Sequence, residues 1–273
     1  MTRAVAPQLR FEAPPELSAV RARFESAVPQ RLAGLLPLLG LTDPGPPISV
    51  VLAPETSDSA RRVPQWIAGF ASESPEVIVI FPARSPGYPH NTLDDVLRHE
   101  VAHVLIHRAA AGRSIPRWFN EGVAMAVERG WRFQDQTELL YQLILGPSIN
   151  LDRLDRLFNG DRSDQSRAYA LAGAFVRDLL DQHGAALPGE ILTRVNHGAS
   201  FESAFTDAAG ITPERSEAEF WKRQRIWTTW VPILTSSATL WAAVTLLALF
   251  AIRRRRQKNA EIEKKWEEEG DEE

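Results

Sequence analysis

The 273-residue chain contains no cysteine. A disulfide framework, a cysteine-ligated metal site and a cysteine nucleophile are therefore all excluded, although the redox compartment stays open. The chain also has no large excess of charge, with a formal net charge of −4, so nothing in its charge points to nucleic acid as a partner. Hydrophobic residues make up 44% of the sequence and charged residues 24%, which indicates a largely globular protein.

The first thirty residues contain no apolar run of signal-peptide length, because charged residues interrupt them repeatedly. Either the protein has no signal peptide, or the chain begins after one has been removed. The sequence leaves both alternatives open.

Charge is absent from positions 230–252, a run of 23 residues rich in Leu, Ala, Val and Ile. A helix of this length spans roughly 30 Å of hydrocarbon, so the run predicts one transmembrane helix; a buried core helix is the alternative.

Seven basic residues in the fifteen positions after the run, against four in the fifteen before it, favour a single-pass protein with a charged cytoplasmic tail at 253–273. The N-terminal domain would then be extracytoplasmic, whereas a tail-anchored protein would keep it in the cytoplasm.

Residues 1–229 are expected to form one α+β domain, with strands first and helices after them. Strands are expected within 46–54, 63–72 and 76–82, where short apolar runs lie between turn-forming residues. The next helix is expected to begin after Asn91 or Thr92, with Asp95 completing a capping box. Further helices are expected at 115–130 and near 134–145, 165–183, 187–197 and 212–228.

The stretch LRHEVAHVLIHR (97–108) contains two histidines four residues apart. On a helix, His99 and His103 share one face and can direct ring nitrogens at a single ion, and neutral imidazole is a preferred ligand of Zn²⁺. Glu100 lies one position round the helix, where its carboxylate can take a proton from a metal-bound water. This spacing is the HExxH arrangement of zinc hydrolases.

A catalytic zinc site usually needs a third protein ligand. Glu121 lies 18 positions after His103, within IPRWFNEGVAMAVERG (115–130), which is expected to form a separate helix. A short loop between the two helices would bring the second back across the first, so that the carboxylate of Glu121 can face both histidines. The set of two histidines and one glutamate is that of a hydrolytic zinc site.

HEVAH followed at this distance by RWFNEGVAM resembles the gluzincin branch of the zincin metallopeptidases, and more narrowly the bacterial peptidase MA-like group. The resemblance covers about residues 48–185. It implies a zincin-like fold with a small mixed sheet, an active-site helix and a helical subdomain. It also implies one Zn²⁺ ion held by His99, His103 and Glu121, Glu100 as general base, and a peptide or protein substrate.

One departure from the pattern concerns the fourth residue after the third ligand. Thermolysin-like relatives carry an acid there that orients a ligating histidine, whereas this chain has Met125. The orienting group is therefore expected elsewhere, for example at a backbone carbonyl.

The segment SRAYALAGAFVRDLL (166–180) resembles the downstream helix of the same family, which carries a tyrosine at this place. Tyr169 is therefore expected to donate a hydrogen bond to the developing oxyanion, although a core role with a local hydrogen bond is the alternative. Arg167 and His197 are weaker candidates for the same role. His107 is expected to be a structural residue at a helix end, and Trp118 a core residue.

The sequence as a whole thus predicts a membrane-anchored zinc metallohydrolase, with a peptidase as the main hypothesis. The alternative is a catalytically inactive, membrane-tethered binding or scaffold protein that keeps the same fold. The intact residues of the predicted metal site count against that alternative.

Overall fold

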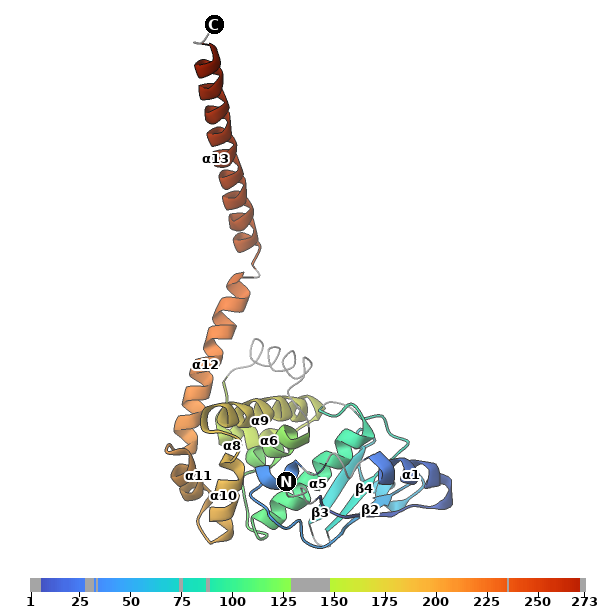
Figure 1. Ribbon diagram of the computed structural model, residues 1–273. Helices are drawn as coiled ribbons and strands as arrows, with labels where there is room; N and C mark the ends of the chain where they lie inside the picture. Colours follow the sequence, from blue (N-terminus) through green and yellow to red (C-terminus); the bar gives the residue numbers. More distant parts are fainter. Residues whose placement is uncertain are drawn as a thin grey trace. The chain divides into compact units, whose positions relative to one another are not determined.

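A computed structural model of the chain describes residues 6–27, 32, 34–73, 76–86, 89–128, 148–234 and 236–270. Over these residues the protein combines helices with one sheet (Figure 1). The chain forms two compact units, 1–222 and 223–273. The helix expected near 134–145 lies outside the described residues.

The sheet of the first unit has four described strands in the order β1-β2-β4-β3. The strands are β1 (Leu9–Glu12), β2 (Ile48–Leu52), β3 (Gly69–Glu73) and β4 (Glu76–Ile80). β2 runs parallel to β1 and β4, whereas β3 pairs antiparallel with β4. β2, β3 and β4 fall at the three places where strands were expected, and β3 forms an edge of the described sheet.

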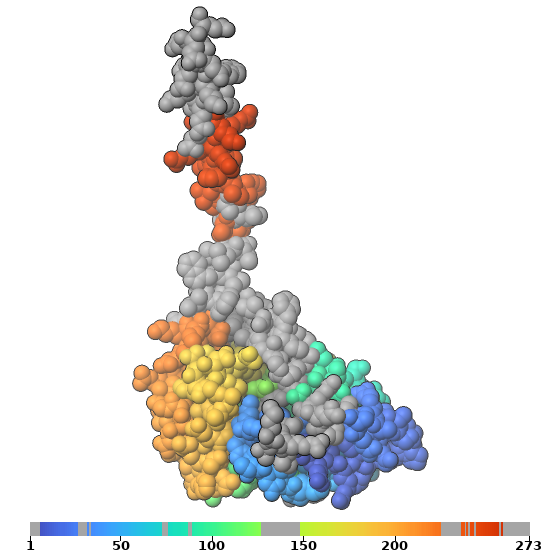
Figure 2. All heavy atoms as spheres, in the orientation of Figure 1, coloured from blue at the N-terminus to red at the C-terminus, as the bar shows by residue number. Residues whose placement is uncertain are grey.

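Helices occupy most of the rest of the first unit. The N-terminal part contains the short 3₁₀ helix η1 (Pro15–Leu17) and helices α1 (Ser18–Ala27), α3 (Leu35–Leu38) and α4 (Asp58–Arg62). After the sheet come α5 (Leu93–Ala109), α6 (Arg117–Glu128), α8 (Leu151–Leu157), α9 (Arg162–His183), α10 (Leu187–Asn196) and α11 (Phe201–Ala209). Helix α12 (Pro213–Leu234) begins in the first unit and ends in the second. On the face shown in Figure 2, the N-terminal residues (blue) and helices α9 to α11 (yellow to orange) lie at opposite sides of the first unit.

α5 is the central helix of the first unit, because it packs against β3 and β4 and also against α6. α6 in turn packs against α9. An aromatic cluster fixes the first turn of α6: the Trp118 ring lies within 5.0–6.4 Å, centroid to centroid, of four phenylalanine rings. Trp118 is 3% exposed, in agreement with the core role expected for it.

Gly122 allows α6 and α9 to approach closely. A Cβ atom at this position would lie 2.5 Å from Val176 Cγ2 and 2.6 Å from the carbonyl oxygen of Ala172 on α9. A Cβ atom is essentially never this close to a non-bonded atom, so a larger residue at 122 would force something in the contact to move. The glycine that follows Glu121 in the sequence therefore sets the distance between α6 and α9.

The predicted transmembrane helix is wrong. Among the helices that the structure describes, none is both long enough and apolar enough to span a membrane. The uncharged run 230–252 is divided between two helices, because α12 ends at Leu234 and α13 (Ser237–Gly270) begins three residues later. The uncharged part of α13, residues 237–252, rises about 24 Å at 1.5 Å per residue, short of the roughly 30 Å of a hydrocarbon core. The predicted single-pass membrane localisation is therefore also wrong, because it depended on that helix.

Candidate metal centre

Helix α5 carries the first three residues of the site, and its start is fixed as the sequence predicted. The Thr92 hydroxyl accepts a hydrogen bond from the Asp95 backbone N–H at 3.1 Å, and the Asp95 carboxylate accepts one from the Thr92 N–H at 3.1 Å. This capping box sets where the helix begins and hence which face it presents. His99 and Glu100 are buried, at 2% and 8% exposure, in the part of α5 that lies between the sheet and α6.

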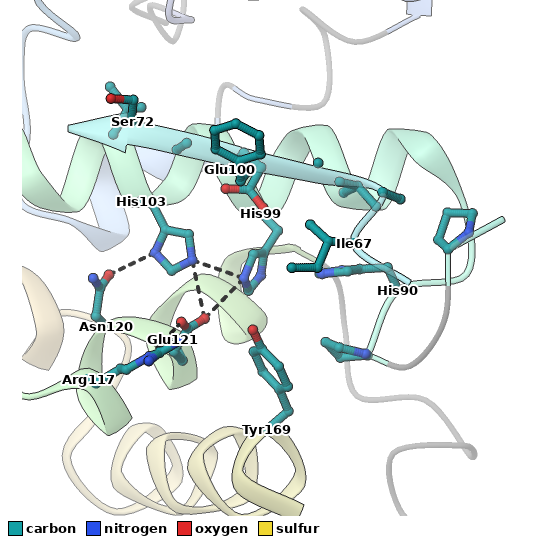
Figure 3. Close-up of a pocket in the computed structure, with 18 of the residues that line it drawn as sticks. Ile67, Ser72, His90, His99, Glu100, His103, Arg117, Asn120, Glu121 and Tyr169 are labelled. Carbon is teal, nitrogen blue, oxygen red and sulfur yellow. Dashed lines mark hydrogen bonds and ion pairs between the residues drawn. The ribbon is translucent and has the colours of Figure 1, made fainter. Parts of the chain in front are cut away.

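Three atoms from α5 and α6 converge on one point (Figure 3). His103 Nε2 lies 3.0 Å from His99 Nε2 and 3.2 Å from Glu121 Oε2, and His99 Nε2 lies 3.3 Å from the same oxygen. Ligands about 2.0–2.1 Å from a tetrahedral zinc ion are about 3.3 Å from one another. The spacing of the three atoms therefore fits a single ion of that size, as does the chemistry of the donor set.

His103 is oriented by a side chain that lies next to Glu121 in the sequence. The Nδ1 atom of His103 lies 2.9 Å from Asn120 Oδ1. An amide oxygen can only accept, so the neutral form of His103 carries its proton on Nδ1 and directs its Nε2 lone pair at the site. Met125, which stands where thermolysin-like enzymes carry an orienting acid, packs instead near Gly173 on α9.

The first turn of α6 is held by residues of α8 and of the turn that follows it. The Asp155 carboxylate accepts hydrogen bonds from the backbone N–H groups of Arg117 and Trp118, at 3.1 and 2.6 Å. The Arg117 guanidinium donates to Asn159 Oδ1 at 2.8 Å and lies 3.5 Å from Glu121 Oε1. Because an acid from another helix caps α6, Glu121 sits close to a firmly anchored helix start.

Charges at the three-atom centre favour an ionised Glu121 beside a cation. Burial alone would raise the pKa of the Glu121 carboxyl, but the charge and hydrogen bonds of His103 and His99 outweigh it and hold that pKa well below its usual value. Burial likewise opposes protonation of His103, yet Glu121 raises the His103 pKa to about 9. Burial and the neighbouring His103 lower the pKa of His99. The centre thus attracts one positive charge, which a proton or a metal ion can supply.

Glu100 lies beside this centre and is not one of the three converging groups. Burial raises the pKa of its carboxyl, against the opposing effect of His103 and His99. An interaction with the backbone of Ala71 on β3 also lowers this pKa, and both Glu100 and Ala71 line the same cavity. A buried carboxyl with a raised pKa is suited to take up a proton and pass it on.

A cavity of about 590 Å³ opens over the centre. It is lined by β3 from Gly69 to Ser72, by the residues of the centre and by Tyr169 on α9. The Tyr169 hydroxyl points towards His99 and Glu121 in Figure 3, and burial together with the two nearby glutamates raises the pKa of that phenol well above its usual value. Tyr169 therefore stays protonated and able to donate a hydrogen bond.

No model of a known protein family matches this chain. A search of curated proteins finds no match either. The resemblance to gluzincins thus stays a prediction. The argument about function rests on the geometry of the three converging groups.

Three other residues considered from the sequence, His107, Arg167 and His197, differ in whether they line the cavity. His107 lines it without joining the three converging atoms. His197 lies at the end of α10, where its Nδ1 is 2.8 Å from the Thr193 carbonyl oxygen, and neither His197 nor Arg167 is among the described residues that line the cavity.

Sequence reasoning missed His90 and the orienting role of Asn120. The His90 ring packs edge-on against His99 with ring centroids 4.6 Å apart, and it lines the cavity. The position of Asn120, directly before the third ligand on a helix that crosses α5, is a signal that could have pointed to its role. No comparable signal marks His90, which lies in the segment before α5.

Proposed function

We propose that the protein is a zinc-dependent metallohydrolase that cleaves peptide bonds. The observation that supports this most strongly is the convergence of His99 Nε2, His103 Nε2 and Glu121 Oε2 at 3.0–3.3 Å from one another. Three protein ligands leave a fourth position for a water molecule or a substrate oxygen, which is typical of catalytic zinc sites and not of structural ones. A bound zinc ion supplies a Lewis acid that polarises the scissile carbonyl and lowers the pKa of a water to about 7.

Glu100 and Tyr169 supply the proton transfers and the charge stabilisation. The carboxylate of Glu100 removes a proton from the attacking water and delivers it to the nitrogen of the leaving amine. The Tyr169 hydroxyl donates a hydrogen bond to the carbonyl oxygen as negative charge develops there. Both side chains line the cavity that contains the three converging atoms.

The shape of the cavity favours an extended peptide as substrate. Residues 69–72 of the edge strand β3 form one wall, and an edge strand can add an extended peptide through backbone hydrogen bonds. Because Glu100 lines the same cavity as residues 69–72, a peptide paired with β3 would run past the general base.

The variant Glu100→Gln tests the mechanism. We expect the zinc content to stay at wild-type level, because Glu100 is not a ligand, and the hydrolysis of casein or of a pooled peptide library to fall by roughly 10²–10⁴-fold. Zinc content is measured by elemental analysis and hydrolysis by the appearance of new amino termini. Wild-type activity in zinc-loaded Glu100→Gln would contradict the proposed mechanism.

A further inference from the structure

The two ends of the cavity differ in chemical character. The end beyond the C-terminus of β3 contains Glu76, the strand partner of Glu73. The end before the N-terminus of β3 is lined by Trp66 and Ile67, which lie just before that strand in the sequence. Figure 3 shows Ile67 and His90 at this second end and Ser72 near the first. The N-terminal end of β3 is thus the apolar end of the cleft.

Trp66 stands out at the apolar end because it is 46% exposed. Among the described residues of the first unit, no other large apolar side chain is exposed; the remaining ones of this kind lie on α13. A single exposed apolar residue would need no explanation on an open surface. Trp66, however, lines the same cavity as the converging histidines.

The backbone that carries Trp66 is held firmly. Residues 64–67 form a turn in which the Ile67 N–H donates to the Pro64 carbonyl oxygen at 3.0 Å. Both of those residues also accept hydrogen bonds from one nitrogen of Arg84, whose Nη1 lies 3.0 Å from the Pro64 oxygen and 2.8 Å from the Ile67 oxygen. The turn is therefore clamped at its two ends, directly beside the exposed tryptophan.

Arg84 is itself anchored in the protein interior at 7% exposure. Its guanidinium lies 4.1 Å over the centre of the Phe81 ring, forms a two-pronged ion pair with Glu55 at 2.8 and 3.1 Å, and donates to the Ala60 carbonyl oxygen at 2.9 Å. A buried arginine with this many partners leaves the turn little freedom. Trp66 is thus presented to the cleft by a preorganised support.

From this arrangement we propose that Trp66 is a specificity-determining residue, whose indole ring binds a large apolar, preferably aromatic, side chain of the substrate. That side chain lies on the side of the scissile bond that faces the N-terminal end of β3. The inference rests on the proposed function, because it takes the centre as the point of cleavage. Aromatic rings pack well against tryptophan, and the adjacent Ile67 extends the apolar surface.

Hydroxamates test this proposal because they bind a catalytic zinc ion directly and require no natural substrate. Acetohydroxamate carries the metal-binding group alone, and phenylalkyl hydroxamates with arms of one to four methylene groups add a ring at increasing reach. The measured quantity is the ratio of the affinity of each phenylalkyl compound to that of acetohydroxamate, in the zinc-loaded full chain. For the best arm length we expect a ratio of roughly ten or more in the wild type.

We expect Trp66→Ala to lose most of this ratio and Trp66→Phe, which keeps a ring, to retain most of it. Trp241→Ala serves as the matched control, since it removes an exposed tryptophan from α13 (68% exposed) that does not line the cavity. The ratio in the control should equal that of the wild type. Circular dichroism confirms that each variant is folded.

The outcomes separate this inference from the proposed function. If acetohydroxamate binds but Trp66→Ala keeps the full phenylalkyl advantage, the role of Trp66 is refuted and the metal centre stands. If acetohydroxamate does not bind the zinc-treated wild type, the proposed function fails, and the inference fails with it.

Discussion

Asn120 influences how well His103 binds a metal ion, because its Oδ1 lies 2.9 Å from His103 Nδ1 and accepts a hydrogen bond from it. Without the acceptor, the His103 ring can rotate or move its proton to Nε2, and either change weakens the ligand. We expect Asn120→Ala to lower zinc affinity about 10–100-fold, as measured by competition with a chromogenic chelator. Asn196→Ala, at an exposed position of α10, is the control, and equal affinities in the two variants would contradict the orienting role.

His103 also gives the metal-free protein a defined response to pH. Despite burial, Glu121 raises the pKa of His103 to about 9, above the roughly 6.5 of an unfolded histidine. Protonated His103 therefore stabilises the metal-free fold below about pH 6.5, and this contribution is lost as pH rises through about 9. Zinc competes with that proton, so zinc affinity should rise over the same interval.

Urea unfolding at several pH values, in EDTA and in excess zinc, measures both effects. We expect the stability of the metal-free protein to fall between about pH 6.5 and 9, while the added stability from zinc grows. The variant His103→Gln should remove both trends. A metal-free stability that does not change over this interval would show that His103 and Glu121 are not coupled in this way.

The sequence was sufficient to propose His99, Glu100, His103 and Glu121, because the first three follow from helical spacing and the fourth from its position on the next helix. It was insufficient for His90 and Asn120. The ring contact of His90 with His99 depends on where a loop places a side chain, and local spacing gives no signal for it. The hydrogen bond from His103 to Asn120 depends on how α6 crosses α5, for which the place of Asn120 beside Glu121 is only an indirect signal.

The contact between α6 and α9 holds Glu121 and Tyr169 at a fixed separation, and Gly122 makes it possible. Gly122→Ala would place a methyl group 2.5 Å from Val176 Cγ2 and 2.6 Å from the Ala172 carbonyl oxygen. We expect the free energy of unfolding to fall by about 1–3 kcal/mol from overpacking, although alanine is the better helix former. Chemical denaturation measures the change.

Gly173→Ala is a matched control for that substitution, because it lies in the same contact between α6 and α9. There the new methyl group would meet only the flexible side chain of Met125, whose end lies at 3.0–3.1 Å and can move aside. We therefore expect a much smaller loss of stability than for Gly122→Ala. Equal losses in the two variants would show that the rigid backbone contact at Ala172 is not decisive.

Elements were predictable where one local signal dominates. The capping box of Thr92 and Asp95 located the start of α5, and the apolar runs located β2 and β4. β1 was missed because four residues that alternate Leu9 and Phe11 with charged neighbours give a weak signal. The prediction from the uncharged run 230–252 was wrong because absence of charge does not require one continuous helix, and the run is divided between α12 and α13.

The centre joins two helices of the first unit that pack on different partners. His99 and His103 belong to the helix that packs on the sheet, whereas Glu121 belongs to the helix that packs on α9. An ion held by all three would oppose separation of these helices and would be lost on unfolding. Zinc binding should therefore appear as stability of the whole chain and not only as a property of the site.

For the 273-residue chain, free zinc at about 100 times its dissociation constant should raise the free energy of unfolding by about 2.7 kcal/mol relative to EDTA. Glu121→Gln removes the anionic ligand and should abolish most of this increment at the same zinc concentration. Glu190→Gln, an exposed glutamate on α10, should keep it. The gain in unfolding free energy depends on zinc concentration only if the folded state binds the ion, so it is measured by thermal unfolding at a series of zinc concentrations. If Glu121→Gln gains as much stability from zinc as the wild type does, the ion binds at another site.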